Sequence, residues 1–256
     1  MEFSLSIDSA FALFPASQAE LTNPALKSVL NQYGYRAFDK SQLPTLDWLT
    51  AMQRRRLSRF AKLSLHAAFQ ASQLASVTDV PLSMVFSSRH GDLHKTNGLL
   101  NDIAGQNGLS PTAFSLSVHN AAAGLYSIFT DNTQQHNAIS AGKDSIFMAL
   151  ADAYTRLKTT DCQQVLVVHT DQVLPDDYLR FADEDQVDHA VAFVVSLAGN
   201  SDVNTVNKLS LSATPSEIDS QKTPSALALY QWWQQGAQIL ELVTENRLWR
   251  LSKNDQ

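Results

Sequence analysis

The sequence is short of cysteine, of charge and of long apolar runs, and each shortage excludes something. Cys162 is the single cysteine among 256 residues, which excludes an intrachain disulfide and a cysteine-rich metal site. Charged residues make up 17% of the chain, and the formal net charge of −6 argues against bulk binding of nucleic acid. No run of about 18 apolar residues occurs, so we expect no membrane span.

The beginning of the chain does not resemble a targeting segment. Residues 1–8 lack the basic region and the apolar core of a signal peptide. They alternate between apolar and polar residues instead, which is typical of a half-buried strand. With the lone cysteine, this start favours a reducing cytoplasm as the location. The hydrophobic content of 44% is that of a globular domain rather than a disordered chain.

What the sequence does contain is an alternation of strand-like and helix-like segments. Apolar residues recur at steps of three and four over residues 57–75, as on one face of a long helix. The continuous apolar runs at 165–168 and 190–195 are typical of central strands covered on both faces. Further strands are expected at 82–86 and 136–142, and further helices at 92–106, 120–129 and 145–157. This order predicts an α/β fold with a mixed sheet covered by helices.

The two ends of the chain are less regular. Residues 8–44 are polar, contain three prolines and are predicted to form loops around a short helix. Beyond residue 200 the pattern predicts a strand at 209–211, a helix at 226–233 and two short strands around 245–246. We expect 201–256 to pack as an extension on a single domain that spans 1–256.

The segment around Lys143 predicts a strand that turns sharply into a helix, with small residues at 140–142. The first turn of a helix favours negative charge, and a cysteine there would ionise to a thiolate. Lys143 is instead cationic at this end of the helix dipole, and it is no nucleophile unless it loses its proton. This combination argues against ordinary acyl-thioester chemistry at the turn.

A longer block around this turn resembles a β-ketoacyl synthase. Residues 118–128, followed by 139–145, resemble the stretch of that family that runs from its interface helix to its nucleophilic cysteine. In the family an Asn with a Gly four residues later precedes the cysteine, as Asn120 and Gly124 do here without a gap. Lys143 falls where the thiol should be.

The resemblance is clear over residues 45–200 and most specific over 120–145. It implies a thiolase-like half with a mixed sheet of the five-stranded type, truncated relative to a full synthase. The chain departs from the family because Lys143 replaces the nucleophile and no His-x-Gly-Thr-like motif follows residue 200. No histidine follows His189, so the general-base and oxyanion groups have no candidates at the expected places. We therefore expect no catalytic residue, no cofactor and no metal.

Within the family, such a chain resembles the short chain-length factors of aryl polyene gene clusters. The resemblance implies a heterodimer with a full-length β-ketoacyl synthase, in which this subunit shapes the acyl tunnel for polyketide or fatty-acid-like synthesis. The acyl carrier protein would be met mainly through that partner. The residues implied at the partner interface and tunnel are Ala113, Phe114, Val118, His119, Asn120, Ala121, Ala122, Gly124, Ile128, Ile139, Ser140, Ala141 and Gly142.

Two alternatives to this role stay open at the level of sequence. The first is an autonomous enzyme that processes acyl thioesters with an unusual nucleophile or a deprotonated Lys143. The second is a scaffold that only stabilises the synthase. Each predicts a different outcome when the chain is purified without a partner.

One basic cluster has two interpretations. It forms either the solvated start of an amphipathic helix or a docking patch for an acidic carrier protein or its phosphopantetheine phosphate. Its members are Arg54, Arg55, Arg56, Arg59 and Lys62.

The remaining polar candidates have simpler explanations. His90 and His94 are four residues apart, a metal-like spacing, but no third ligand is in view. Residues 183–185 are explained as a solvated acidic turn. Lys143 is expected to have a structural role: it either simply occupies the vacated pocket, or fills it and anchors an acidic residue such as Asp144 or one from a partner.

Overall fold

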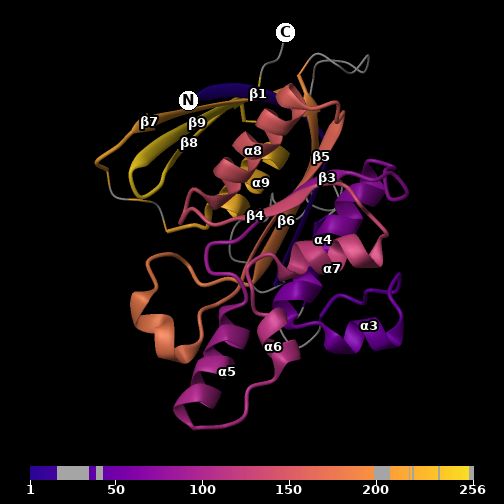
Figure 1. Ribbon diagram of the computed structural model, residues 1–256. Coiled ribbons are helices and arrows are strands. Elements are labelled where there is room, and N and C mark those ends of the chain that lie inside the picture. The colour runs from indigo at the N-terminus through magenta and orange to yellow at the C-terminus, as the bar shows by residue number, and fades with distance from the viewer. Residues whose placement is uncertain are drawn as a thin grey trace.

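The computed structural model describes residues 1–15, 35–38, 43–198, 208–218, 220, 222–235 and 237–253. Its centre is a nine-stranded sheet in the order β4-β3-β5-β6-β1-β7-β9-β8, with β2 paired to β1 (Figure 1). The strands are β1 Glu2–Pro15, β2 Tyr35–Phe38, β3 Ser83–Ser87, β4 His136–Ile139, β5 Gln164–Asp171, β6 His189–Leu197, β7 Lys208–Pro215, β8 Ile239–Val243 and β9 Arg247–Lys253. The predicted α/β architecture with a mixed sheet is confirmed.

Five of these strands, β4-β3-β5-β6-β1, correspond to the five-stranded sheet that the resemblance implies. β3 runs parallel to β4 and β5, whereas β6 is antiparallel to both β5 and β1. β5 and β6 are buried along almost their whole length, which explains their continuous apolar runs. Beyond β1 the sheet continues through β7, β9 and β8, which are antiparallel to their neighbours.

Helices cover both faces of the sheet and create two apolar cores. On one face, α8 (Ser145–Thr159) and α9 (Ser225–Gln235) pack with Val165 and Val167 of β5. On the other, α4 (Arg59–Leu74) and α7 (Ala121–Phe129) pack with the intervening Leu166 and Val168 (Figure 1). Because side chains alternate along a strand, one apolar run supplies both cores.

The basic segment before α4 forms a helix of its own. α3 spans Ala51–Arg56, begins with a capping box at Thr50 and ends at Leu57, whose backbone is extended. α4 starts afresh after Ser58, whose hydroxyl caps the first turn. The interpretation of Arg54–Arg56 as the start of the long helix is therefore wrong. These residues form the last turn of α3, where cations suit the helix dipole.

Three further helical segments connect the strands: α5 (Leu93–Ala104), α6 (Pro111–Ser115) and the 3₁₀ segment η1 (Asp176–Phe181). The sequence pattern predicts α5, which begins after its N-cap Asp92. It predicts neither α6 nor η1, which are too short for a helical period to show. In the described parts of the chain, no helix combines the length and apolarity needed to cross a membrane.

β1 is longer than the sequence pattern predicts. Alternation predicts a strand over residues 1–7 and loops from residue 8, but β1 continues to Pro15. A register shift between Ile7 and Ser9 interrupts its pairing with β6 and breaks the simple alternation. β2 also lies where loops are predicted. The short helix predicted in this region falls outside the described residues.

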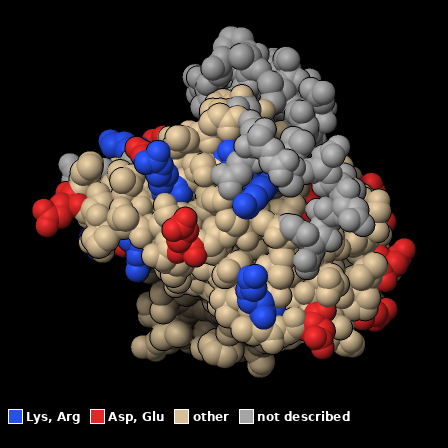
Figure 2. All heavy atoms as spheres, turned by 90° about the horizontal axis from the view of Figure 1, so that it is seen from above, with Lys and Arg blue, Asp and Glu red and all other residues tan. Residues whose placement is uncertain are grey.

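Charge on the surface is scattered. The face in Figure 2, which looks down on Figure 1 from above, shows basic and acidic side chains interspersed among uncharged ones. The described residues gather no broad patch of one sign on this face. This distribution agrees with the exclusion of bulk nucleic-acid binding by net charge.

Candidate functional site

The turn between β4 and α8 is tight. Gly142 has a φ of +56°, in the left-handed region that glycine adopts without strain. The Ser145 hydroxyl donates to the Gly142 carbonyl at 2.7 Å and accepts from the Ala141 N–H at 3.0 Å, which closes the turn. β4 ends at Ile139, so residues 140–142 belong to this turn rather than to the predicted strand.

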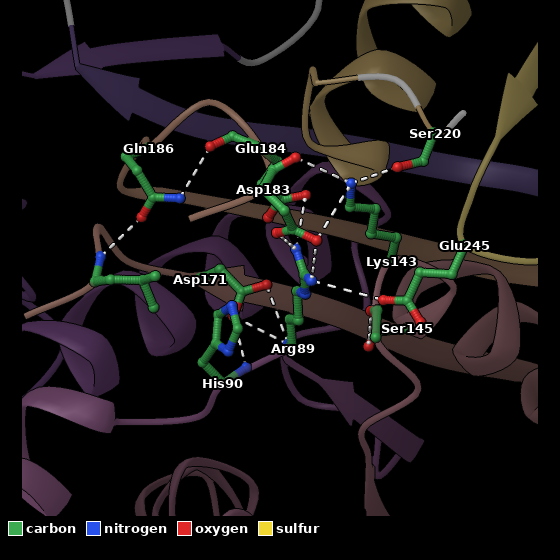
Figure 3. A network of polar contacts seen from close by, with 12 residues as sticks. Arg89, His90, Lys143, Ser145, Asp171, Asp183, Glu184, Gln186, Ser220 and Glu245 are labelled. Carbon is green, nitrogen blue, oxygen red and sulfur yellow. Dashed lines mark hydrogen bonds and ion pairs between the residues drawn. The ribbon is translucent and has the colours of Figure 1, made fainter. Parts of the chain in front are cut away.

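Lys143 follows the turn and is buried. Only 3% of its side chain is exposed. Its Nζ donates to the Asp183 carbonyl oxygen at 3.1 Å and to Ser220 Oγ at 2.6 Å, and it lies 3.5 Å from Asp183 Oδ2 (Figure 3). The acidic residue that Lys143 anchors is therefore Asp183. The suggestion of Asp144 is wrong, because the Asp144 carboxylate is engaged elsewhere.

Arg89 joins the same group of charges from the end of β3. Its guanidinium donates to both carboxylate oxygens of Asp183, at 2.7 and 2.8 Å, and lies 3.4 Å from Glu184 and 3.6 Å from Glu245. The hydrogen bonds from Arg89 lower the pKa of Asp183 to about 2. Burial raises the pKa of Glu184. Residues 183 and 184 are thus tied into this group. Asp183 still exposes 49% of its side chain, as a solvated turn predicts, but the ion pairs with Arg89 are not part of that prediction.

These contacts define a group that we call the Lys143 network. Its members are Arg89, Lys143, Asp183, Glu184, Ser220 and Glu245. They come from the β3–α5 loop, the β4–α8 turn, the β5–β6 loop and the part of the chain after residue 208 (Figure 3). Glu245 lies so close to the turn that a Cβ on Gly142 would be 2.6 Å from its Oε1. The C-terminal segment thus helps to bury the turn.

Asp144 ties the same C-terminal segment to the start of α8. It is the N-cap residue, but its side chain makes no capping hydrogen bond. Its carboxylate accepts from Trp249 Nε1 at 2.7 Å and pairs with Arg247, both on β9. Trp249 also stacks on Phe147 of α8, with ring centroids 4.6 Å apart. The helix start is therefore held by side chains 103 and 105 residues away in the sequence.

The arrangement holds an ammonium group where the resemblance places a thiol. A lysine nucleophile needs a neutral amine with a free lone pair. Lys143 Nζ instead contacts a carbonyl, a hydroxyl and a carboxylate oxygen. These oxygen acceptors match the three donors of a lysine ammonium group.

Comparison with known proteins assigns the family. The model of the beta-ketoacyl synthase N-terminal domain matches residues 30–252. The chain belongs to this family. Among solved structures, it is similar to a chain of "Ketosynthase (ApeO) in Complex with its Chain Length Factor (ApeC) from Xenorhabdus doucetiae". The identity is 26% and the TM-score 0.78, over 98% of this chain and 99% of that chain.

Two more distant structures agree on the fold. The ishigamide ketosynthase/chain length factor has a TM-score of 0.61 at 15% identity, over 85% of this chain and 69% of that chain. A β-ketoacyl synthase from Burkholderia phymatum STM815 has a TM-score of 0.56 at 12% identity, over 84% of this chain and 65% of that synthase. The predicted thiolase-like fold is confirmed. No sequence among the curated proteins matches the chain.

In this ketoacyl synthase domain, the residues predicted at the partner interface lie on α6, α7, the loop between them, the end of β4 and the β4–α8 turn. Three of them are strongly exposed apolar side chains: Phe114 at 62%, Val118 at 43% and Ile128 at 70%. Asn120 is exposed and Ala121 half-buried. We call these five residues, together with the outer edge of β4, the α6–α7 face.

The other predicted interface residues are less accessible. Ala122 is 4% exposed and packs into the core beneath α7, so it does not reach the α6–α7 face. His119 is held by a hydrogen bond between Nε2 and a backbone carbonyl at the end of β3, at 3.1 Å. Ala113 and Gly124 are half-buried. Asn120 is the N-cap of α7, yet its side chain makes no capping hydrogen bond.

β4 is a terminal strand of the described sheet. It pairs in parallel with β3, from Met84 opposite His136 to Ser87 opposite Ile139. Within the described residues, no second strand pairs with its outer edge. An unpaired edge presents a row of N–H and C=O groups and can accept a strand from another chain.

The predicted carrier-docking arginines divide between structural and exposed positions. Arg54 donates to two carbonyls of the loop before α3. Arg59 forms an ion pair with Asp188 at 2.7 Å, just before β6. Arg55 and Arg56 are exposed at the end of α3. Two of the four predicted docking arginines, Arg54 and Arg59, therefore make contacts within the fold.

His90 and His94 do not form a site together. His94 Nε2 bonds to the carbonyl oxygen of Val173 at 2.7 Å, and burial lowers the pKa of His90. In the described part of the chain, His169, Asp171 and His189 are instead the group with a metal-like arrangement. In the sequence, only the His-x-Asp spacing of His169 and Asp171 within a strand points to this group. It can be recognised as a possible site only when the strand pairing that places His189 opposite Asp171 is known.

Proposed function

We propose that this chain is a non-catalytic subunit that pairs with a full-length β-ketoacyl synthase and acts as its chain-length factor. The observation that carries the proposal is the burial and ion pairing of Lys143, which stands where the sequence resemblance places the family nucleophile. Losing the attacking atom while retaining the surrounding fold suits a subunit that contributes a surface and performs no chemistry itself. The likeness to a chain of a ketosynthase–chain length factor complex supports the same role.

The α6–α7 face is the proposed partner interface. Its exposed large apolar side chains are Phe114, Val118 and Ile128, and three more, Leu100, Ile103 and Leu109, lie on or just after α5. Exposed apolar surface of this kind can mark an interaction site. The unpaired edge of β4 adds backbone groups that a partner strand can bond. Together they supply the apolar contacts and the main-chain hydrogen bonds of a stable heterodimer.

The acyl tunnel would be completed by α7 and the β4–α8 turn. Ala121 at the start of α7 is small and half-buried, so its replacement by a larger residue would intrude into space next to the partner. The bulk at such a position decides how many carbon atoms fit before the chain meets a wall. We place the product among aryl polyenes and the complex in the cytoplasm, with carrier protein reaching it mainly through the synthase.

Co-expression tests the pairing. The chain is co-expressed with a full-length β-ketoacyl synthase encoded beside it, and we expect the two to co-purify as a stable complex. The complex should elongate acyl carrier protein thioesters with malonyl units, whereas this chain alone should not. Turnover by the chain alone that Lys143→Ala abolishes would establish the autonomous enzyme and reject the subunit role.

A tunnel substitution separates a chain-length factor from a scaffold. Ala121→Phe should shorten the products of the complex, because the added ring occupies tunnel volume. Ala237→Phe, at an exposed alanine away from this face, is the matched control and should leave product length unchanged. If Ala121→Phe lowers only the yield, the chain stabilises the synthase without shaping its tunnel.

A further inference from the structure

Two neighbouring strands bring His169, Asp171 and His189 together. β5 and β6 pair in antiparallel register with Asp171 opposite His189. His169 lies two residues before Asp171, so both side chains leave β5 on the same face of the sheet. One potential ligand atom from each residue lies within 4.8 Å of the other two.

The cluster is buried in the interior, below the loop that carries Arg89. His169 and Asp171 expose 7% and 6% of their side chains, and His189 is 1% exposed. Asp171 accepts hydrogen bonds from the Ser88 hydroxyl at 2.6 Å and from the Arg89 N–H at 3.0 Å. The burial of these three side chains distinguishes the cluster from the exposed acidic clusters that are common on protein surfaces without a metal ion.

His189 has one ring nitrogen engaged and one free. Its Nδ1 lies 2.9 Å from the Val187 carbonyl, an acceptor, so Nδ1 carries the proton. Among the described residues, its Nε2 is buried with no hydrogen-bond partner. The lone pair of this buried nitrogen is therefore available to a metal ion.

The contacts of His169 are compatible with the same arrangement. Ser87 Oγ lies 3.0 Å from His169 Nδ1 and 3.2 Å from the Val168 carbonyl oxygen, and His169 Nε2 lies 3.0 Å from Asp171 Oδ2. With its proton on Nδ1, the ring donates to Ser87 Oγ, and the lone pair of Nε2 faces Asp171. In the other tautomer Nε2–H donates to Asp171, and binding of a metal ion displaces that proton.

We propose that His169 Nε2, His189 Nε2 and the Asp171 carboxylate bind a divalent transition-metal ion, and that this ion is Zn²⁺. Two imidazole nitrogens and one carboxylate oxygen form a donor set that suits zinc, with a fourth position left for water. With the ion bound, each imidazole donates its other N–H to an oxygen, as metal-binding histidines do. The ion joins β5 to β6 beneath the Arg89 loop.

Metal analysis of the full chain tests the site. After incubation with Zn²⁺ and removal of excess ion, we expect about one zinc per chain and a chelator-sensitive melting temperature. Replacement by Co²⁺ should give the visible absorption of a cobalt ion bound by nitrogen and oxygen ligands. Wild-type protein that binds neither ion, and whose melting temperature ignores chelator, overturns the proposal and establishes a proton-bridged His169–Asp171 pair.

Variants locate the ion. His189→Gln and His169→Gln should each lose the bound zinc and the cobalt absorption, whereas the control His94→Gln at an exposed histidine should retain both. Equal metal content in His189→Gln and wild type would place the ion elsewhere and reject this site. If a variant does not fold, the chelator and cobalt measurements on the wild type still decide the question. None of these readouts depends on the synthase partner, so they stand apart from the proposed function.

Discussion

The Lys143 network and the α6–α7 face differ in how completely their groups are satisfied. In the network, buried or half-buried charges from four separate segments pair with one another, and Lys143 makes three polar contacts. On the α6–α7 face, apolar side chains such as Ile128 are open to solvent, and β4 has an unpaired edge. The position where the resemblance places the family nucleophile is filled, and the surface that we propose as the partner interface is left open. Each substitution below disrupts either the contacts around the β4–α8 turn or the α6–α7 face.

The largest effect is expected where Asp144 holds the C-terminal segment against α8. Asp144→Ala leaves the buried Trp249 Nε1 without an acceptor and removes the partner of Arg247. We expect the free energy of unfolding to fall by about 2–4 kcal/mol. Urea denaturation of the purified chain measures it.

Asp152→Ala is the matched control for this prediction. Asp152 pairs with Arg156 four residues away on the same helix and is 30% exposed. Such a pair contributes about 0.3–0.5 kcal/mol, so the control should be nearly as stable as wild type. Equal losses in the two variants would show that the contacts of Asp144 do not anchor the C-terminal segment.

A substitution at Phe114 tests the α6–α7 face. Phe114→Asp places a charge at the centre of the proposed interface, and we expect the dissociation constant for the synthase to rise about 30-fold, or about 2 kcal/mol. Phe181→Asp is a close control, because Phe181 is 61% exposed and Phe114 is 62% exposed. Titration calorimetry with the purified synthase gives both constants. Similar weakening by both variants would remove the α6–α7 face from the interface.

Replacing Lys143 should change the free energy of unfolding by a smaller amount. Lys143→Met keeps the bulk of the side chain but removes the ammonium donor from the Asp183 carbonyl oxygen and from Ser220 Oγ, and we expect a loss of about 1–2 kcal/mol in unfolding free energy. Lys158→Met, at an exposed helix position, should change little. Product length of the complex should stay the same, since Lys143 does not face the partner in this proposal. A more stable Lys143→Met chain would mean that burying the ammonium costs more than its contacts return.

The smallest effect is the pH dependence that Asp183 contributes. Arg89 lowers the pKa of Asp183 from 3.8 to about 2, so the native state favours the carboxylate. Its contribution to stability is complete above the unfolded pKa and is lost as the pH falls from 3.8 towards 2. Because half of the side chain is exposed, we expect less than about 1 kcal/mol. Glu184, whose pKa is raised by burial, acts in the opposite sense.

Comparison of wild type with Asp183→Asn isolates this contribution from that of Glu184. The variant should show a shallower fall of unfolding free energy in that acidic window. Chemical denaturation at a series of acidic pH values gives both curves. Parallel curves would mean that Arg89 does not favour the charged form of Asp183 in the native state.

Much of the fold follows from the sequence pattern. The apolar runs at 165–168 and 190–195 predict β5 and β6, and the periodicity before Thr159 predicts α8. The two strands predicted around 245–246 are also present, as β8 and β9. The break between α3 and α4 is missed, although Thr50 and Ser58 are both capping residues, because the apolar period hides it.

The site is only partly visible in the sequence. Resemblance to the family locates Lys143, but nothing local indicates that Asp183 and Arg89 surround it, because these three residues come from different loops. The same limit applies to His189 and Asp171, whose proximity depends on strand register. Contacts between distant segments are fixed by tertiary packing, and no periodic pattern in a single sequence records them.

The position of β1 has a consequence for how the chain acquires its fold. Leu5 pairs with Leu197 of β6 on one side and with Leu209 of β7 on the other, and Ser4 bonds to Ser210 across 206 residues of sequence. β1 is made before β6 and β7 and therefore waits for both partners during synthesis. Pairing at such long range is slow, and meanwhile the apolar side chains of β1 stay exposed. We expect nascent chains to remain sensitive to protease until β7 has emerged, so β1 stays open to chaperones until then.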